Sequence, residues 1–239
     1  MTGFPGFPPE AVAFFRGIKK NNKREWFLPR KQLFEDRVKA PMIALVSALN
    51  RARARTAPEY CTDPGKAVYR FYRDTRFSKD KKPYKDHIAA TLARKGMERH
   101  RSAGFYFSVS DTGVEVAGGV YMPEREELLA IRSHLDQRHE DFRRLLRNAK
   151  LRKLMGDIHG DRLSRVPKGF SPNHPAEDLL RHKQWYHYIV LEGGIVTTPA
   201  LYREILARFQ AMLPVIEFLN TPLLAQPGKP KERNVFDFL

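Results

Sequence analysis

The spacing of apolar residues changes along this chain of 239 residues and limits the folds open to it. Before Arg53 and again after Met122, apolar side chains recur every three or four residues, which predicts helices. Between Ala67 and Tyr121 the apolar residues are mainly branched and aromatic, which predicts strands. Strands grouped in the middle of a chain, with helices on either side, predict an α+β fold: a central, mainly antiparallel sheet flanked by helices in a single domain.

The order of the predicted elements argues against a doubly wound nucleotide-binding fold, because strands and helices do not alternate regularly. Asp111–Thr112–Gly113 has the composition of a hairpin turn between two of the strands. We expect one domain over residues 1–224, followed at 225–239 by a polar linker that ends in an apolar tip. The predicted strands cover 67–72, 87–92, 104–110, 113–121 and 185–191, and the predicted helical regions cover 9–20, 24–53 and 199–219, with another that begins near 122.

Positive charge is concentrated in one part of the chain. The formal net charge is +16, and residues 66–101 supply half of it, with twelve basic residues against four acidic ones. Within this part, Arg70–Lys85 reads RFYRDTRFSKDKKPYK and contains seven cations, four aromatic residues and two aspartates. Cations attract a polyanion and rings offer a stacking surface, so the stretch predicts a site for a phosphate-bearing ligand. The predicted ligand-binding residues are Arg70, Arg73, Asp74, Arg76, Lys79, Lys81, Tyr84 and Lys85.

The two aspartates of this stretch allow two interpretations. If residues 69–77 form one strand, Arg70, Asp74 and Arg76 share a face, and Asp74 orients the two guanidinium groups. Two neighbouring cations lower the pKa of Asp74, which favours a positioning role over that of a general base. In the structural alternative, Asp74 and Asp80 pair with the basic residues to join two strands, and no ligand is bound.

The other candidate sites are weaker. No Cys/His spacing typical of a metal site and no HExxH motif occurs, so the sequence predicts neither a metal nor a cofactor. Gly118–Gly119 precedes a helix start, but three glutamates follow it, so backbone room for a neighbouring group explains the glycines better than a phosphate cradle. Arg162, Arg165 and Lys168 are predicted to add a second wall to the anion site if the two segments meet.

The chain's surroundings can also be predicted. Cys61 is the only cysteine, which excludes an intrachain disulfide and fits a reducing compartment. The first residues do not have the pattern of a signal peptide, and no apolar run approaches the length of a membrane span. We therefore expect a cytoplasmic protein with no membrane partner.

The motifs together resemble a bacterial family known as domain of unknown function 2461, over about residues 7–224. The resemblance implies no activity, but it does imply a shared site that includes Arg70, Arg73, Asp74, Arg76, Phe77, Lys81 and Tyr84. The family pattern often has a third glycine where this chain has Ala117, which weakens a glycine-loop function. The residues that carry the resemblance lie at 21–27 (NNKREWF), 70–85, 104–107 (GFYF), 118–123 (GGVYMP) and 167–170 (PKGF).

Three functions remain open from the sequence. The leading hypothesis is binding of a phosphate-bearing anion, including nucleic acid, with Phe71, Tyr72 or Tyr84 stacking on bases or sugars. The second is an enzyme acting on a small phosphorylated or carboxylated substrate, in which the arginines clamp the anion and Tyr84 or Lys85 transfers a proton. A deep pocket around Arg73 favours the enzyme, and an open basic groove favours a polymer. The third is a structural or protein-interaction module.

Overall fold

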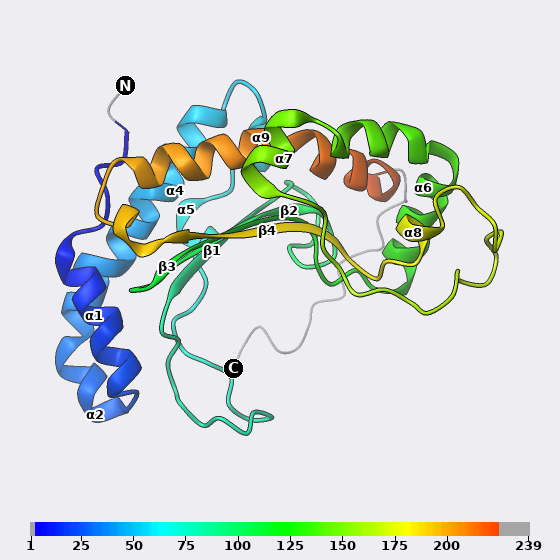
Figure 1. Cartoon of the computed structure of the whole chain (residues 1–239). Coiled ribbons are helices and arrows are strands. Elements are labelled where there is room, and N and C mark those ends of the chain that lie inside the picture. Colours follow the sequence, from blue (N-terminus) through cyan, green and yellow to red (C-terminus); the bar gives the residue numbers. More distant parts are fainter. Residues whose placement is uncertain (1–2, 225–239) are drawn as a thin grey trace.

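A computed structural model describes residues 3–224 as helices packed on one four-stranded sheet (Figure 1). The predicted α+β fold class is confirmed. The first helix spans the residues predicted for it. The helical region predicted over 24–53 is also confirmed, because five helical elements follow one another there without a break. The helical elements are α1 (Pro9–Lys20), α2 (Arg24–Phe27), η1 (Leu28–Arg30), α3 (Lys31–Phe34), η2 (Glu35–Lys39), α4 (Ala40–Arg53), η3 (Pro58–Tyr60), α5 (Pro64–Ala67), α6 (Arg125–Leu146), α7 (Ala149–Met155), α8 (Glu177–Leu180), η4 (Gly193–Ile195) and α9 (Ala200–Leu224).

The sheet is antiparallel throughout, with its strands in the order β1-β2-β3-β4. The predicted hairpin at 111–113 joins β2 to β3, and the backbone N–H of Ser110 donates to the oxygen of Gly113 at 3.0 Å. Residues 121–184, which include α6, α7 and α8, separate β3 from its other neighbour, β4. The strands are β1 (Ile88–Ala93), β2 (Gly104–Val109), β3 (Gly113–Val120) and β4 (Trp185–Glu192).

The two faces of the sheet differ. On the upper face in Figure 1, α9 packs against β2 and β3, and α7 packs against β4. Phe105 of β2 lies there with its ring centroid 4.6 Å from that of Phe209 on α9. Since side chains alternate along a strand, Tyr106 of β2 faces the opposite side, which we call the lower face. The apolar side chains of the strands therefore pack above the sheet, and the tyrosines Tyr106, Tyr186 and Tyr188 lie on its lower face.

The strand predicted over 67–72 is wrong. Isolated bridges link Val68 to Ala90 and Tyr72 to Tyr84, and α5 already occupies the start of the range. Phe71 explains the difference, because its ring joins a buried aromatic cluster contributed largely by the N-terminal helices and turns the chain away from β1. This cluster contains Phe14, Phe27, Phe34, Phe71 and Tyr84.

The segment between α5 and β1 descends below the lower face of the sheet (Figure 1). It includes the stretch Arg70–Lys85, called the basic segment from here on. Within residues 3–224, no helix is both long and apolar enough to cross a membrane. The linker and tip predicted at 225–239 lie outside the described residues.

Candidate functional site

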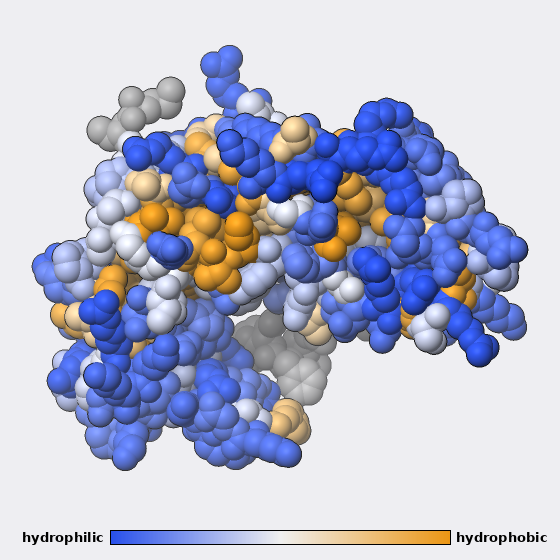
Figure 2. Space-filling view, viewed as in Figure 1, coloured by the Kyte–Doolittle hydropathy of each residue, from blue (hydrophilic) through white to orange (hydrophobic). Residues whose placement is uncertain are grey.

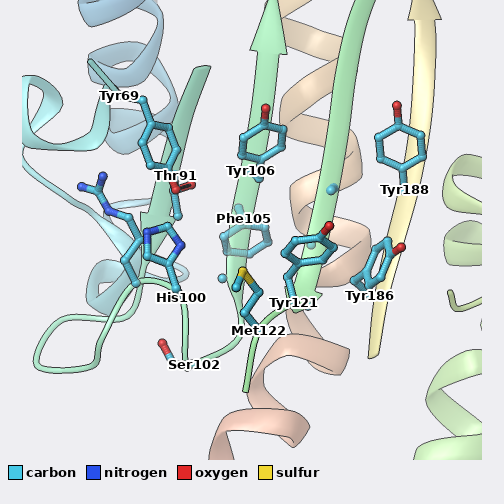
Figure 3. A pocket seen from close by; sticks show the side chains of 15 residues that line it. Tyr69, Thr91, His100, Ser102, Phe105, Tyr106, Tyr121, Met122, Tyr186 and Tyr188 are labelled. Atoms are coloured by element: carbon cyan, nitrogen blue, oxygen red, sulfur yellow. Dashed lines mark hydrogen bonds between the residues drawn. The ribbon is translucent and has the colours of Figure 1, made fainter. Parts of the chain in front are cut away.

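A groove opens on the lower face of the sheet, with a cavity of about 520 Å³ (Figure 3). Its floor follows from the strand register, which places Thr91, Tyr106, Ala117 and Tyr188 in one row across the four strands. Ala117 is small, so the rings of Tyr106 and Tyr188 stand on either side of a low centre. The lining residues are Tyr69, Thr91, Arg99, His100, Ser102, Gly104, Phe105, Tyr106, Ala117, Gly118, Gly119, Tyr121, Met122, Tyr186 and Tyr188.

The glycine pair makes the floor thin. A Cβ atom on Gly118 would lie 2.7 Å from the Met212 sulfur atom on α9, so this position accommodates the helix above the sheet. Gly119 has a φ of +136°, and a Cβ atom there would lie 2.2 Å from the backbone oxygen of Trp185. Both positions confirm that the glycines provide backbone room for neighbouring groups.

Tyr69 forms one wall of the groove with three cationic or titratable neighbours. Its hydroxyl group lies 2.9 Å from Oγ1 of Thr91, and its ring stacks on that of His100 with centroids 6.0 Å apart. The Arg99 guanidinium lies 5.1 Å from the centroid of the Tyr69 ring, and the Lys85 ammonium lies 5.2 Å from it. Both distances are within the range of cation–π attraction. The wall thus combines rings with positive charge.

Lys85 is half-buried beside this wall, and burial, followed by the nearby charge of Arg70, lowers its pKa. Within the described part of the chain, no carboxylate forms an ion pair with Lys85, Arg70 or Arg99. A cation that is partly desolvated and lacks a counterion gains when an anionic ligand supplies one. Lys85 and Arg99, which are partly buried, therefore favour an anion at the end of the groove formed by Tyr69, and the exposed Arg70 adds positive charge near Lys85.

The floor tyrosines remain protonated at neutral pH. Burial raises the pKa of Tyr106 to about 12, and burial together with Glu115 raises the pKa of Tyr188 to about 12. The Tyr188 hydroxyl donates to Oε1 of Glu115 at 3.0 Å, and Ser108 donates to its Oε2 at 2.8 Å. Glu115 thus has hydrogen bonds on both carboxylate oxygens and fixes the orientation of the Tyr188 ring.

The aspartates of the basic segment each bind one arginine. Asp74 accepts from Nε of Arg76 at 3.1 Å and from its Nη2 at 2.8 Å, and this arginine lowers the pKa of Asp74 to about 2. Asp80 accepts from Nη1 of Arg73 at 2.7 Å. Arg70 does not share Asp74 with Arg76 by an ion pair within residues 3–224, so the predicted arrangement of one carboxylate between two guanidiniums does not form. Both aspartates pair with arginines, as the structural alternative expected, but both pairs lie within the basic segment and join no strands.

The remaining lysines of the basic segment are exposed. Lys81 donates to the backbone oxygen of Thr75 at 2.9 Å. Lys79 and Lys82 point their charges to solvent, and neither forms a side-chain ion pair with any residue between 3 and 224. The segment therefore keeps positive charge available after its two aspartates are satisfied.

The aromatic residues of the basic segment fall into two groups. Phe71 and Tyr84 are 5% and 3% exposed and belong to the aromatic cluster, so their rings serve packing. Tyr72 is about half exposed, and Phe77 is 95% exposed, with the Arg76 guanidinium 5.8 Å from its ring centroid. Of the three rings predicted for stacking, Tyr72 is therefore the accessible one. Phe77, which was not predicted for stacking, is a second accessible ring.

The predicted site residues thus lie mostly outside the groove, on the segment below it. Lys85 lies beside the Tyr69 wall with the charge of Arg70 nearby, whereas Arg73, Arg76 and Lys79 are not among the residues that line the groove. The second basic cluster, Arg162, Arg165 and Lys168, does not line it either; the loop that carries this cluster lies near α8, far from the basic segment in Figure 1.

The groove residues were not predicted as a site. Tyr186 and Tyr188 are two residues apart in a predicted strand, and this spacing is a signal that both rings share a face. Figure 3 shows these tyrosines together with Tyr106 and Tyr121, pointing into the same space. Figure 2 shows hydrophilic surface on either side of the hollow below the sheet.

Comparison with known proteins gives a family but no activity. A family model described as "Conserved hypothetical protein (DUF2461)" matches residues 10–218. No curated protein matches the chain. Among residues 3–224, no group of three or more His, Cys, Asp and Glu side chains could hold a metal ion.

Proposed function

The chain belongs to the family named domain of unknown function 2461, and we propose that it binds a ligand that carries both a phosphate and a planar ring, with a nucleotide as the simplest form. One observation carries the proposal: the wall ring Tyr69 has the cations Arg99 and Lys85 at 5.1 Å and 5.2 Å from its centroid, beside a floor of further tyrosines. A phosphate gains from the cations, and a base or a sugar gains from the rings.

The shape of the groove supports a flat group. Ala117 and Gly119 leave the centre of the floor low, while Tyr106 and Tyr188 border it. A planar ring can therefore rest against the backbone of β3 with its faces or edges toward the tyrosines. The Tyr188 hydroxyl already donates to Glu115, so it can only accept from such a ligand, whereas the protonated Tyr106 hydroxyl offers a donor to its ring nitrogens, oxygens or sugar.

Of the two residues proposed for proton transfer in an enzyme, Tyr84 is 3% exposed and lies in the aromatic cluster. Lys85 is the one that lies beside the groove wall. The arrangement supports binding more directly than it supports a reaction, so we place binding first.

Isothermal titration calorimetry at low salt tests the proposal with AMP, adenosine and inorganic phosphate as probes. We expect AMP to bind more tightly than either of its parts. Because a stacked base contributes about 1–3 kcal/mol, Tyr106→Leu should weaken AMP binding by roughly 5-fold to 150-fold, whereas Tyr106→Phe, which keeps the ring, should change it little. Lys85→Gln should weaken AMP and phosphate but leave adenosine unchanged.

Lys153→Gln, an exposed lysine on α7, is the matched control for Lys85→Gln. If AMP binds no better than phosphate, or if Tyr106→Leu behaves like Tyr106→Phe, the proposal is wrong. If Lys85→Gln and Lys153→Gln weaken AMP binding equally, the effect of Lys85 comes from net charge and not from its position.

A further inference from the structure

We infer that the ligand is a single-stranded nucleic acid that runs from the groove along the basic segment, with one base in the groove and its neighbours on the segment. This inference rests on the proposed function and extends it from a nucleotide to a polymer. It depends on the positions of cations and rings that the groove itself does not use.

Much of the local charge lies beyond the reach of a ligand confined to the groove. Among the side chains that line the groove, Arg99 is the cation, and Lys85 and Arg70 adjoin it at the Tyr69 wall. Lys79 and Lys82 lie elsewhere on the basic segment and do not line the groove; both are exposed and form no ion pair with any described residue. Charges in series along one segment suit the repeated phosphates of a chain.

The two ion pairs give the segment a defined shape without removing this charge. Asp74 binds Arg76 through both carboxylate oxygens, and Asp80 accepts from Arg73 and from the backbone N–H of Lys82 at 3.1 Å. Both aspartates also receive backbone hydrogen bonds two residues on, as in Asx turns. The turns thus hold the segment in place while Lys79 and Lys82 stay available.

An exposed ring marks a second place for a base. Phe77, near the middle of the basic segment, is 95% exposed, and the Arg76 guanidinium lies 5.8 Å from its ring centroid. A single exposed apolar residue is unremarkable on a protein surface. Here it stands among cations on the segment that joins the groove wall, and ring and guanidinium together form the kind of surface on which an unpaired base stacks.

The groove geometry favours single strands over duplexes. Its rings lie in a floor that is flanked by the Tyr69 wall and by the loop that carries Arg99 and His100. A base can contact that floor with its face or edge only if it is not stacked between neighbouring bases of its own strand. Bases inside a duplex are not presented in this way, whereas those of a single strand are.

Fluorescence anisotropy with labelled oligo-dT and oligo-rU of two, four, eight and twelve nucleotides tests the inference, with a twelve-base-pair duplex alongside. We expect affinity to rise with length and single strands to bind more tightly than the duplex. For the eight-nucleotide strand, the slope of log K against log salt is negative. Lys79→Gln/Lys82→Gln should make it less steep by about 1.4, since each phosphate contact of a single strand contributes about 0.7. Phe77→Ser should lower the affinity for this eight-nucleotide strand by at least about 5-fold.

The matched control is Lys150→Gln/Lys153→Gln, which removes the same charge from exposed positions on α7. It should leave the slope unchanged, and neither Phe77→Ser nor Lys79→Gln/Lys82→Gln should change AMP binding. Circular dichroism melting checks that each variant is folded.

The outcomes separate the two proposals. If AMP binds as proposed but affinity does not grow with length, or if duplex and single strand bind equally, the polymer inference is overturned and the nucleotide site stands. Equal slopes for the control and the Lys79→Gln/Lys82→Gln variant also overturn it. If AMP binds no better than phosphate, the proposed function fails, and the polymer inference that rests on it fails with it.

Discussion

Asn220 on α9 links a buried helix to the loop that forms one side of the groove. Its side chain is fully buried, accepts from the N–H of Ala103 at 2.9 Å and donates to the oxygen of Ala103 at 2.9 Å. Its Nδ2 also donates to the Tyr60 hydroxyl at 3.1 Å. Since Ser102 and Gly104 line the groove, Asn220 fixes the groove loop from the opposite face of the sheet.

The variant Asn220→Ala removes the partner of two buried backbone groups of Ala103. A buried donor or acceptor that loses its partner costs about 1–3 kcal/mol, so the free energy of unfolding should fall by about 2–6 kcal/mol. Native proteins have an unfolding free energy of about 5–15 kcal/mol, so this loss is a large share of the stability. For a protein of this size, a loss near 4 kcal/mol lowers Tm by roughly 8–16 °C.

Urea unfolding followed by circular dichroism measures this loss, with Thr221→Ala as the control on the next residue of the same helix. Thr221 is exposed, and its hydroxyl donates within the helix to Glu217, so its removal should change stability by no more than about 0.5 kcal/mol. Hydrogen exchange should show faster exchange at Ala103 in Asn220→Ala. A loss below about 1 kcal/mol, or one equal to that of Thr221→Ala, would refute the reasoning.

Further predictions concern the glycine floor, a buried histidine and an exposed ion pair. Gly119→Ala should lower the free energy of unfolding, measured in urea, by about 1–3 kcal/mol or more, because it strains a φ of +136° and brings Cβ against the backbone of β4. A Cβ atom at Gly194 has open space, so Gly194→Ala should lower it far less. Burial lowers the pKa of His187 to about 4, so the unfolded state binds a proton at this residue first as pH falls below about 6.5. From pH 7 to pH 5, His187 alone should lower the free energy of unfolding by about 2 kcal/mol. Burial lowers the pKa of His100, His134 and His182 in the same direction, so His187→Leu should remove the share that comes from His187 and leave theirs. Asp74→Asn should leave Tm nearly unchanged, since the pair with Arg76 is exposed; a clear fall in Tm would assign this pair a larger structural role.

Local sequence predicted much of the fold. The helix predicted to start at Pro9 and to stop before Asn21 spans Pro9–Lys20, because the proline and the apolar spacing act within one element. The strand predicted over 67–72 failed because Phe71 packs with Phe14 and Phe27, which are distant in sequence. A contact of this kind overrides local β propensity, and periodicity within a window does not reveal it.

The candidate site shows the same limit. The excess of cations in the basic segment was readable directly, and so was the pairing of its two aspartates with arginines, although these pairs do not join two strands. The groove depends instead on register, because Tyr106, Ala117 and Tyr188 share a row only after three strands have paired. Sequence spacing relates Tyr186 to Tyr188 but does not bring either of them to Tyr106.

The glycine floor has a consequence for observing the molecule. Gly118 lines the groove with its backbone, while on the other side of the sheet the position of its missing Cβ atom lies 2.9 Å from Cε of Met212. A ligand in the groove and the methyl group of a fully buried methionine are therefore separated by little more than one layer of backbone. The Met212 methyl resonance should consequently report groove occupancy from inside the core, without a label on the surface that binds.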